Sequence, residues 1–385
     1  MKKIIVITLL LILSHSLYAQ TNDSLDQRLH LTLNFNVFDK SKDAKEILRL
    51  WEDLLNQDLM EVNEQNKKYW LKSAFFFAPN LFLPDLTKFK KNAQHYQATV
   101  IKLEQMKPDT FLLKTMFTNT LNDKKETQLG YIYSVYAVKT NQGFKFLSYP
   151  QWYFQKWEKK QVGSITYCFE KSHQFNDRLA AKLDSFNQTI SKIFQSDLQY
   201  PVYFIGNDFD QVLQLLGYDF DAVHGSVEGQ GGYTNPTFKA IFTGNGTEYH
   251  AHEVVHLYLQ KHKLFNIYSH KLTAEGIATL FGGYKGQSLE WNLKNLKKYI
   301  AQNPQESFND ISTYYTIDDT YETDFAYEIG GLICKLVYER EGINGLFDLL
   351  QIGSSDENFY NAVHKHFKVK KEDFGKFIKN ELKNY

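Results

Sequence analysis

The sequence is poor in cysteine and proline and has no excess of either charge. Its only two cysteines, Cys168 and Cys334, lack the spacing of a cysteine zinc site, and their apolar contexts favour buried thiols over a bridge between them. Lysine plus arginine and aspartate plus glutamate both number 44, which argues against a nucleic-acid or membrane-surface partner. By contrast, 43% hydrophobic and 16% aromatic residues in 385 positions are enough for a large core and two domains.

Residues 1–19 have the pattern of a secretory signal. Two lysines precede an apolar stretch over residues 4–13, which is too short to span a bilayer, and the small residue Ala19 ends the cleavage pattern. No cysteine follows for lipid attachment, and loss of the two lysines leaves 42 basic against 44 acidic residues. We therefore expect an exported protein of the periplasm or extracellular space, with no membrane insertion after cleavage.

Residues 20–160 are expected to form a small α+β domain. Apolar positions recur with helical spacing from residue 44 to about residue 65. Four segments rich in β-branched and aromatic residues follow, at 97–103, 110–117, 131–138 and 144–149, with a hairpin signal between the last two. A helix followed by long antiparallel strands is weakly similar to the NTF2-like fold. We expect this domain to recognise or position a ligand rather than to catalyse.

Residues 161–385 are expected to form a mostly helical second domain with a small sheet, which makes the whole chain α+β. Strand patterns at 164–169, 201–205 and 238–244 alternate with helical patterns. The glycine-rich stretch 225–233 is either an edge strand, to which an extended chain can pair, or a flexible loop. Short helices after residue 342 are expected to be scaffold.

A single H-E-x-x-H pattern runs from His252 to His256. On a helix, histidines four residues apart point from the same face, as a shared metal ion requires. Glu253 lies about 100° further round the helix, where it can act on a water rather than bind the ion. After His256 come 18 residues, positions 257 to 274, and then Glu275, which a second helix can return to the ion. Two histidines, one glutamate and an open position are the ligand set of a catalytic zinc.

Other histidines compete with these ligands in principle. His250 precedes His252 by two residues and so faces another side of the helix, which makes it a minor candidate. The other competitors are His224, His262 and His270. His173 belongs to no ligand spacing and is expected at the surface.

The H-E-x-x-H pattern, the 18-residue spacing and the following Glu275-Gly-Ile-Ala resemble the gluzincin metallopeptidases, within them the aminopeptidase-like branch. The resemblance covers about residues 200–350. It implies a zincin-like catalytic domain, one Zn²⁺ held by His252, His256 and Glu275, and Glu253 as general base. Tyr327 matches the tyrosine of the family's Y-E-K-G motif, which implies that it assists the tetrahedral intermediate. Three further tyrosines are rivals for that role, Tyr314, Tyr315 and Tyr321.

The chain departs from the family in three places. The counterpart of the amine-binding G-x-M-E-N strand, which begins at Gly229, has no matching acidic residue, and Ile329 replaces the lysine of Y-E-K-G. Thr279 stands where thermolysin-like enzymes have an aspartate behind the zinc. The sequence therefore predicts a zinc-dependent peptidase acting on a peptide or protein substrate, without specifying aminopeptidase action. The alternative is a catalytically inactive zinc-containing binding or scaffold protein of the cell envelope, which leaves Glu253 unexplained.

Overall fold

The chain forms two compact units, one of Met1–Gln151 with Leu216–Gly225 and one of Trp152–Leu215 with Ser226–Tyr385. The computed structural model describes residues 30–33, 41–57, 68–71, 96–121, 126–221, 231–236, 238–261, 269–314 and 324–385. Helices and two sheets give the α+β class that the sequence predicts. The first break falls inside helix α5 (Tyr149–Lys156) rather than at residue 160, and the return of 216–225 to the first unit was not foreseen. The predicted signal, residues 1–19, lies outside the described residues.

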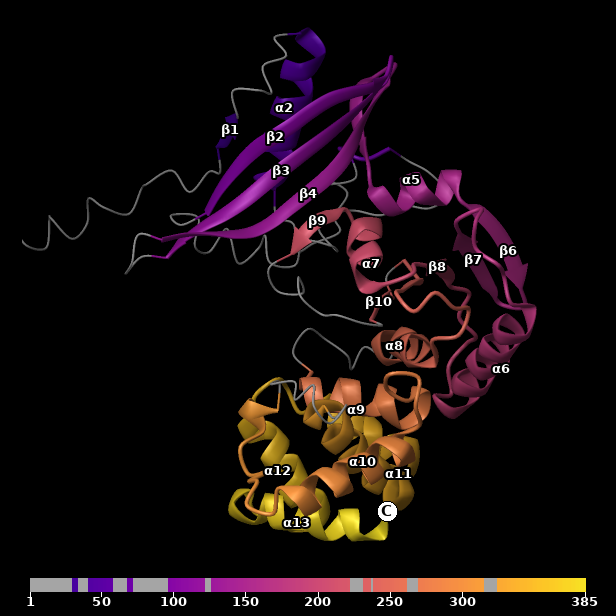
Figure 1. Cartoon of the computed structure of the whole chain (residues 1–385), viewed down its shortest axis with the longest axis vertical. Coiled ribbons are helices and arrows are strands. Elements are labelled where there is room, and N and C mark those ends of the chain that lie inside the picture. The colour runs from indigo at the N-terminus through magenta and orange to yellow at the C-terminus, as the bar shows by residue number, and fades with distance from the viewer. Residues whose placement is uncertain are drawn as a thin grey trace, which may run out of the picture. The chain divides into compact units, whose positions relative to one another are not determined.

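In the first unit, helix α2 (Lys42–Leu55) packs on a six-stranded sheet (Figure 1). The strands run in the order β1 (Leu31–Leu33), β2 (Tyr96–Lys107), β3 (Thr110–Leu121), β4 (Glu126–Thr140) and β5 (Gly143–Leu147), and β9 (Tyr218–Asp221) also pairs with β4. All pairs are antiparallel except β1 with β2. The four predicted strands and their hairpin are confirmed. The helix predicted to run from residue 44 to about residue 65 ends earlier, because α2 ends at Leu55.

Trp51 fixes α2 on this sheet. Its indole Nε1 donates to Thr115 Oγ1 at 2.9 Å, its ring stacks on Tyr133 and the edge of Phe146 lies against it. Such aromatic contacts add about 0.5–1.5 kcal/mol each to the area that they bury. The likeness to the NTF2-like fold stays a prediction.

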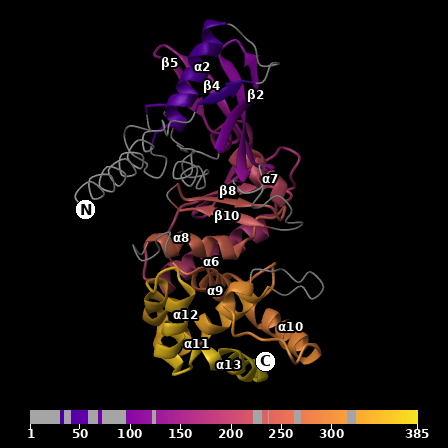
Figure 2. The ribbon, with the colours of Figure 1, turned by 90° about the vertical axis from the view of Figure 1, so that its left-hand side faces the viewer.

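The second unit contains a five-stranded sheet in the order β10-β11-β8-β7-β6. Its strands are β6 (Glu158–Val162), β7 (Ile165–Phe169), β8 (Val202–Ile205), β10 (Gly232–Asn235) and β11 (Ala240–Thr243). The three central strands are parallel, and β10 and β6 pair antiparallel at the two edges. Helices α6 (Asp177–Ile193) and α8 (Ala251–Lys261) lie along one face and α7 (Phe209–Leu216) lies on the other (Figure 2). The edge strand that was one of the two expectations for residues 225–233 is therefore present as β10, which begins at Gly232.

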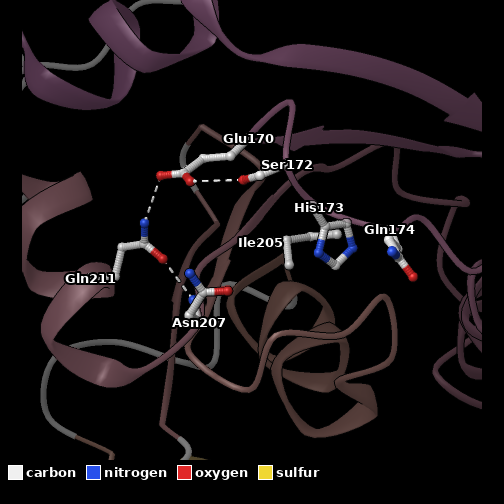
Figure 3. Close-up of a pocket in the computed structure, with 7 residues that line it drawn as sticks. All are labelled: Glu170, Ser172, His173, Gln174, Ile205, Asn207 and Gln211. Carbon is white, nitrogen blue, oxygen red and sulfur yellow. Dashed lines mark hydrogen bonds between the residues drawn. The ribbon is translucent and has the colours of Figure 1, made fainter.

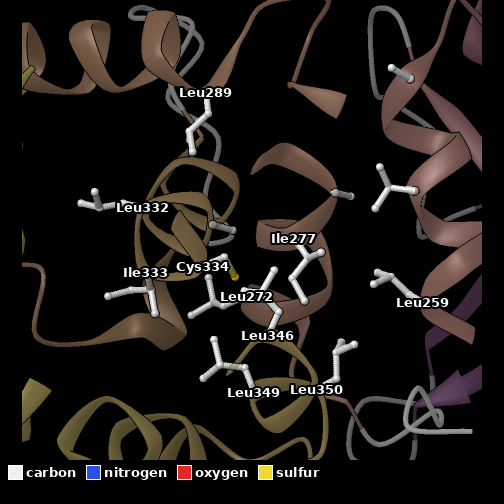
Figure 4. Packing of buried hydrophobic residues seen from close by; sticks show 14 of the residues in the cluster. Leu259, Leu272, Ile277, Leu289, Leu332, Ile333, Cys334, Leu346, Leu349 and Leu350 are labelled. Atoms are coloured by element: carbon white, nitrogen blue, oxygen red, sulfur yellow. The ribbon is translucent and has the colours of Figure 1, made fainter. Parts of the chain in front are cut away.

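Helices complete the second unit. They are α9 (Lys271–Gly282), α10 (Leu289–Gln302), α11 (Phe325–Leu350), α12 (Asp356–Phe367) and α13 (Phe374–Glu381), with short 3-10 turns at Ile311–Thr313, Lys371–Asp373 and Leu382–Asn384. Leu272 and Ile277 of α9 share an apolar core with Leu332, Leu346 and Leu349 of α11 (Figure 4). Each such side chain contributes about 1.5–3 kcal/mol when fully buried. Among the described helices, none is long and apolar enough to cross a membrane.

Two glycines let α9 and α11 touch along their backbones. A Cβ added at Gly276 would lie 2.4 Å from the carbonyl carbon of Gly330, and one at Gly330 would lie 2.4 Å from the carbonyl oxygen of Leu272. Side chains near this crossing are therefore brought close together. Glu275 on α9 and Tyr327 on α11 both lie within one turn of it.

Both cysteines are buried free thiols, which confirms the prediction made from their apolar contexts. Cys334 lies at the crossing of α9 and α11, where its Sγ is 3.7 Å from the carbonyl oxygen of Thr273. Burial raises the pKa of the Cys168 thiol to about 12, so that thiol stays protonated and unreactive at neutral pH.

Candidate metal centre

Three side chains from two helices of the second unit converge: His252 and His256 of α8 and Glu275 of α9. Glu275 Oε2 lies 3.1 Å from His252 Nε2 and 3.5 Å from His256 Nε2. Bonds of about 2.0–2.1 Å to a tetrahedral zinc put ligand atoms roughly 3.4 Å apart. The donor types and these two separations are therefore compatible with a bound metal ion. We call these three residues the cluster.

The backbone after α9 orients the first histidine. His252 Nδ1 lies 2.8 Å from the carbonyl oxygen of Gly283, and a carbonyl only accepts, so Nδ1 carries the proton. The Nε2 lone pair is then free to face the cluster, as a histidine ligand requires. Thr279 is buried, and it is the Gly283 carbonyl oxygen that accepts from His252.

Without a metal, the cluster compensates its own charge. Burial alone would raise the pKa of the Glu275 carboxyl, but the charge of His256 and close contacts with the Nε2 atoms of both histidines hold that pKa well below its usual range. Burial also lowers the pKa of His256, yet the Glu275 charge and hydrogen bond outweigh burial and raise that pKa to about 9. The cluster thus retains a carboxylate and attracts positive charge. A divalent cation would displace the His256 proton, so binding is coupled to proton release.

Glu253 lies beside the cluster but is held by the edge strand. Thr234 Oγ1 on β10 lies 2.7 Å from Glu253 Oε2 and 2.8 Å from the Glu253 carbonyl oxygen. The side chain is not one of the three that converge within ligand distance. A carboxylate next to a cation site, but outside its ligands, is in the position that a general base requires.

Tyr327 is also brought near the cluster. It lies in the first turn of α11, with its ring centroid 5.8 Å from that of His252. Among the described residues its hydroxyl has no hydrogen-bond partner. Burial, followed by the charge of Glu275, raises the pKa of this phenol well above its usual value, so it remains a proton donor.

His250, the minor candidate, is not brought into the cluster. Its Nδ1 lies 3.1 Å from Thr243 Oγ1, and that hydroxyl donates its proton to Asn245 Oδ1 at 2.6 Å. Nδ1 of His250 is therefore the donor. Burial is the main cause that lowers the pKa of His250 to about 4, which keeps the ring neutral at neutral pH.

The other rivals that the structure describes have structural partners. His270 is buried and its Nε2 pairs with Asp356 Oδ1 at 3.1 Å. Tyr314 is buried and its hydroxyl donates to the carbonyl oxygen of Phe308. The remaining candidates, His224, His262, Tyr315 and Tyr321, lie outside the described residues.

A polar cavity of about 200 Å³ lies at the carboxyl ends of β7 and β8 (Figure 3). It is lined by Glu170, Ser172, His173, Gln174, Ile205, Asn207 and Gln211. Gln211 Nε2 donates to Glu170 Oε1 at 2.9 Å, so part of the lining is engaged with itself. His173, which was expected at the surface, is only partly exposed, at 14% of its side chain, and its Nε2 pairs with the buried Glu248 at 2.8 Å. No cluster residue lines this cavity.

Sequence reasoning missed three contacts around the cluster, those of Thr234, Gly283 and Tyr284. Thr234 follows the glycine-rich stretch, and the other two residues follow the ligand helix in a Phe-Gly-Gly-Tyr segment whose only local signal is a helix end. No family model, no curated protein and no solved structure matches the chain.

Proposed function

We propose that the chain is an exported zinc-dependent peptidase whose active site is built on the cluster. The observation that carries the proposal is the convergence of His252, His256 and Glu275 with Glu253 beside them and outside the ligand set. A structural zinc site is usually closed by four protein ligands and has no use for an adjacent carboxylate. Export rests on the signal pattern of residues 1–19 alone.

The residues divide the chemistry of peptide hydrolysis between them. Zinc held by the cluster would supply a Lewis acid, able to polarise a carbonyl and to acidify water. Glu253 takes a proton from the attacking water and passes it to the departing amine as the carbon–nitrogen bond breaks. Tyr327 donates a hydrogen bond to the oxyanion. The products are a carboxylate and an amine.

The edge strand β10 supports an extended peptide as the substrate. It pairs only with β11 among the described strands, and Thr234 on it binds the candidate base. The backbone groups on the open edge of a sheet can pair with an extended chain, which adds that chain to the sheet. A peptide bound in this way would lie beside Glu253.

The test uses protein without residues 1–19 and a mixed peptide library. We expect one zinc per chain by mass spectrometry, cleavage of library peptides, and loss of both in His256→Ala. Removing a group that only hydrogen-bonds to a metal ligand costs about 10–100-fold in metal affinity. Removing His256, a ligand itself, is therefore expected to cost more. Zinc without cleavage would favour the scaffold alternative. No bound metal would overturn the proposal.

Gly232→Ala tests whether the Glu253 side chain needs the space that the missing side chain of Gly232 leaves beside β10. A Cβ there would lie 2.7 Å from Glu253 Cγ and Oε1 and from His250 Cε1, so the carboxylate must move. Because a misplacement of about 1 Å can cost on the order of 100-fold, we expect a comparable fall in kcat with zinc content unchanged. Initial rates and metal analysis measure the two effects. Unchanged kcat, or loss of zinc together with activity, would contradict this role for the glycine.

A further inference from the structure

Tyr284, just after α9, lies flat against Tyr327. The two ring centroids are 4.0 Å apart and the ring planes differ by 18°. The Tyr284 hydroxyl donates to Asp324 Oδ2 at 3.2 Å, and Asp324 Oδ1 accepts from the Ala326 backbone nitrogen at 3.1 Å as the N-cap of α11. Tyr284 therefore contacts both the Tyr327 ring and the residue that starts the Tyr327 helix.

The turn that carries Tyr284 also contacts the cluster. Gly283, the preceding residue, accepts the His252 Nδ1 proton at 2.8 Å. Two backbone hydrogen bonds of 2.9 Å, between Tyr284 and Gln287, close the turn. One short segment thus holds a candidate zinc ligand with one residue and the candidate oxyanion donor with the next.

We propose that Tyr284 is a positioning residue for Tyr327. The inference rests on the proposed function, in which Tyr327 meets the oxyanion. Among the described residues, the contacts of the Tyr327 side chain are those of its ring, with Tyr284 and His252. The stacked Tyr284 ring restricts rotation of the Tyr327 side chain, and its bond to Asp324 fixes the stack relative to α11. A hydrogen-bond donor to an oxyanion must be placed to within about 0.5 Å, so restricting the Tyr327 side chain favours catalysis.

A double-mutant cycle separates positioning from direct action. We expect Tyr327→Phe to lower kcat about 100-fold, as loss of one oxyanion donor does. Tyr284→Leu is expected to lower kcat about 10-fold with KM within twofold, because misplacement of a catalytic group costs rate rather than affinity. Tyr284→Phe keeps the ring and should lose less. In the Tyr327→Phe background, Tyr284→Leu should cause no further loss. A full 10-fold loss there, or none in the wild-type background, would overturn the proposal.

Tyr338→Leu is the matched control. The substitution removes the edge-to-face contact between Tyr338 of α11 and Phe281 of α9, whose ring centroids are 5.3 Å apart. It does not change either ring of the stack between Tyr284 and Tyr327. We expect its kcat to equal that of the wild type. A loss equal to that of Tyr284→Leu would mean that any weakened contact between these helices has the same effect, and would overturn the specific role.

Near-ultraviolet circular dichroism of the metal-free protein gives a readout that does not need activity. Stacked phenols couple, so Tyr284→Leu and Tyr327→Leu should each remove the same band, and the double variant should lose little more. If the wild type cleaves no peptide but this pattern appears, the proposed function fails while the stack stands. If peptides are cleaved but both the spectra and the kinetic effects are additive, the positioning role fails and the peptidase stands.

Discussion

Replacing Glu253 with glutamine is expected to lower kcat at least about 1,000-fold while zinc content stays at one ion per chain. General acid and base groups contribute about 10²–10⁴-fold to rate, and here one residue takes up and delivers the proton. Glutamine has nearly the same shape and still accepts from Thr234 Oγ1, which now lies 2.7 Å from the carboxylate. The substitution therefore removes the proton acceptor and little else.

Metal analysis and single-turnover hydrolysis measure the two expectations separately. Glu253→Asp is the conservative control, since it keeps a carboxylate but withdraws it by one methylene, and its rate should fall between those of the wild type and the glutamine variant. Glu290→Gln, an exposed change on α10, should have the wild-type rate. Activity of Glu253→Gln within about threefold of the wild type would exclude Glu253 as base. Loss of zinc from Glu253→Gln would make the residue a ligand instead.

Much of the fold is predictable from local sequence, and the domain division shows where local sequence fails. The long strands of the first unit and the central strands of the second follow from residue type and alternation. The return of 216–225 to the first unit does not, because it depends on distant partners. Asp219 binds Ser134 Oγ and Lys114 Nζ through one carboxylate oxygen, at 2.6 and 2.8 Å, more than 80 residues away in sequence. Such non-local pairs leave no periodic signal.

The cluster itself was predictable because helical geometry fixes it. Residues 252 and 256 share a helix face whatever surrounds them, and a second helix has only to return Glu275. The contacts that orient these groups were not predictable. A threonine in an edge strand, a backbone carbonyl and a stacked tyrosine act through tertiary position, and their residue types are ordinary in those places. Peptidase activity, zinc and export stay predictions.

Glu328, the residue after Tyr327, is fully buried, and neither of its carboxyl oxygens has a hydrogen-bond partner among the residues that the structure describes. Burial, followed by the nearby Asp324 charge, raises its pKa to about 9 from the usual 4.5. At neutral pH the folded chain keeps this proton, whereas the unfolded chain releases it. The folded state therefore binds more protons between pH 4.5 and about 9, and its stability falls as pH rises through that window. Below pH 4.5 this cost disappears.

Glu328→Met is accordingly expected to raise the free energy of unfolding at pH 7, by about 3 kcal/mol from the cost of protonation at 1.36 kcal/mol per pH unit. Methionine has a similar length and needs no hydrogen-bond partner. The gain should grow by about 1.4 kcal/mol per unit from pH 5 to pH 8.5, measured by urea denaturation. Glu339→Gln is the control on the same helix, since the exposed Glu339 side chain pairs with Lys335. Its free energy of unfolding should change by less than about 1 kcal/mol, and the change should not depend on pH.

Parallel curves of unfolding free energy against pH for Glu328→Met and the wild type would mean that Glu328 titrates alike in the folded and unfolded chain. If the two curves instead converge as pH rises, the ionised Glu328 carboxylate must be compensated in the folded chain by a partner, and methionine cannot replace that interaction.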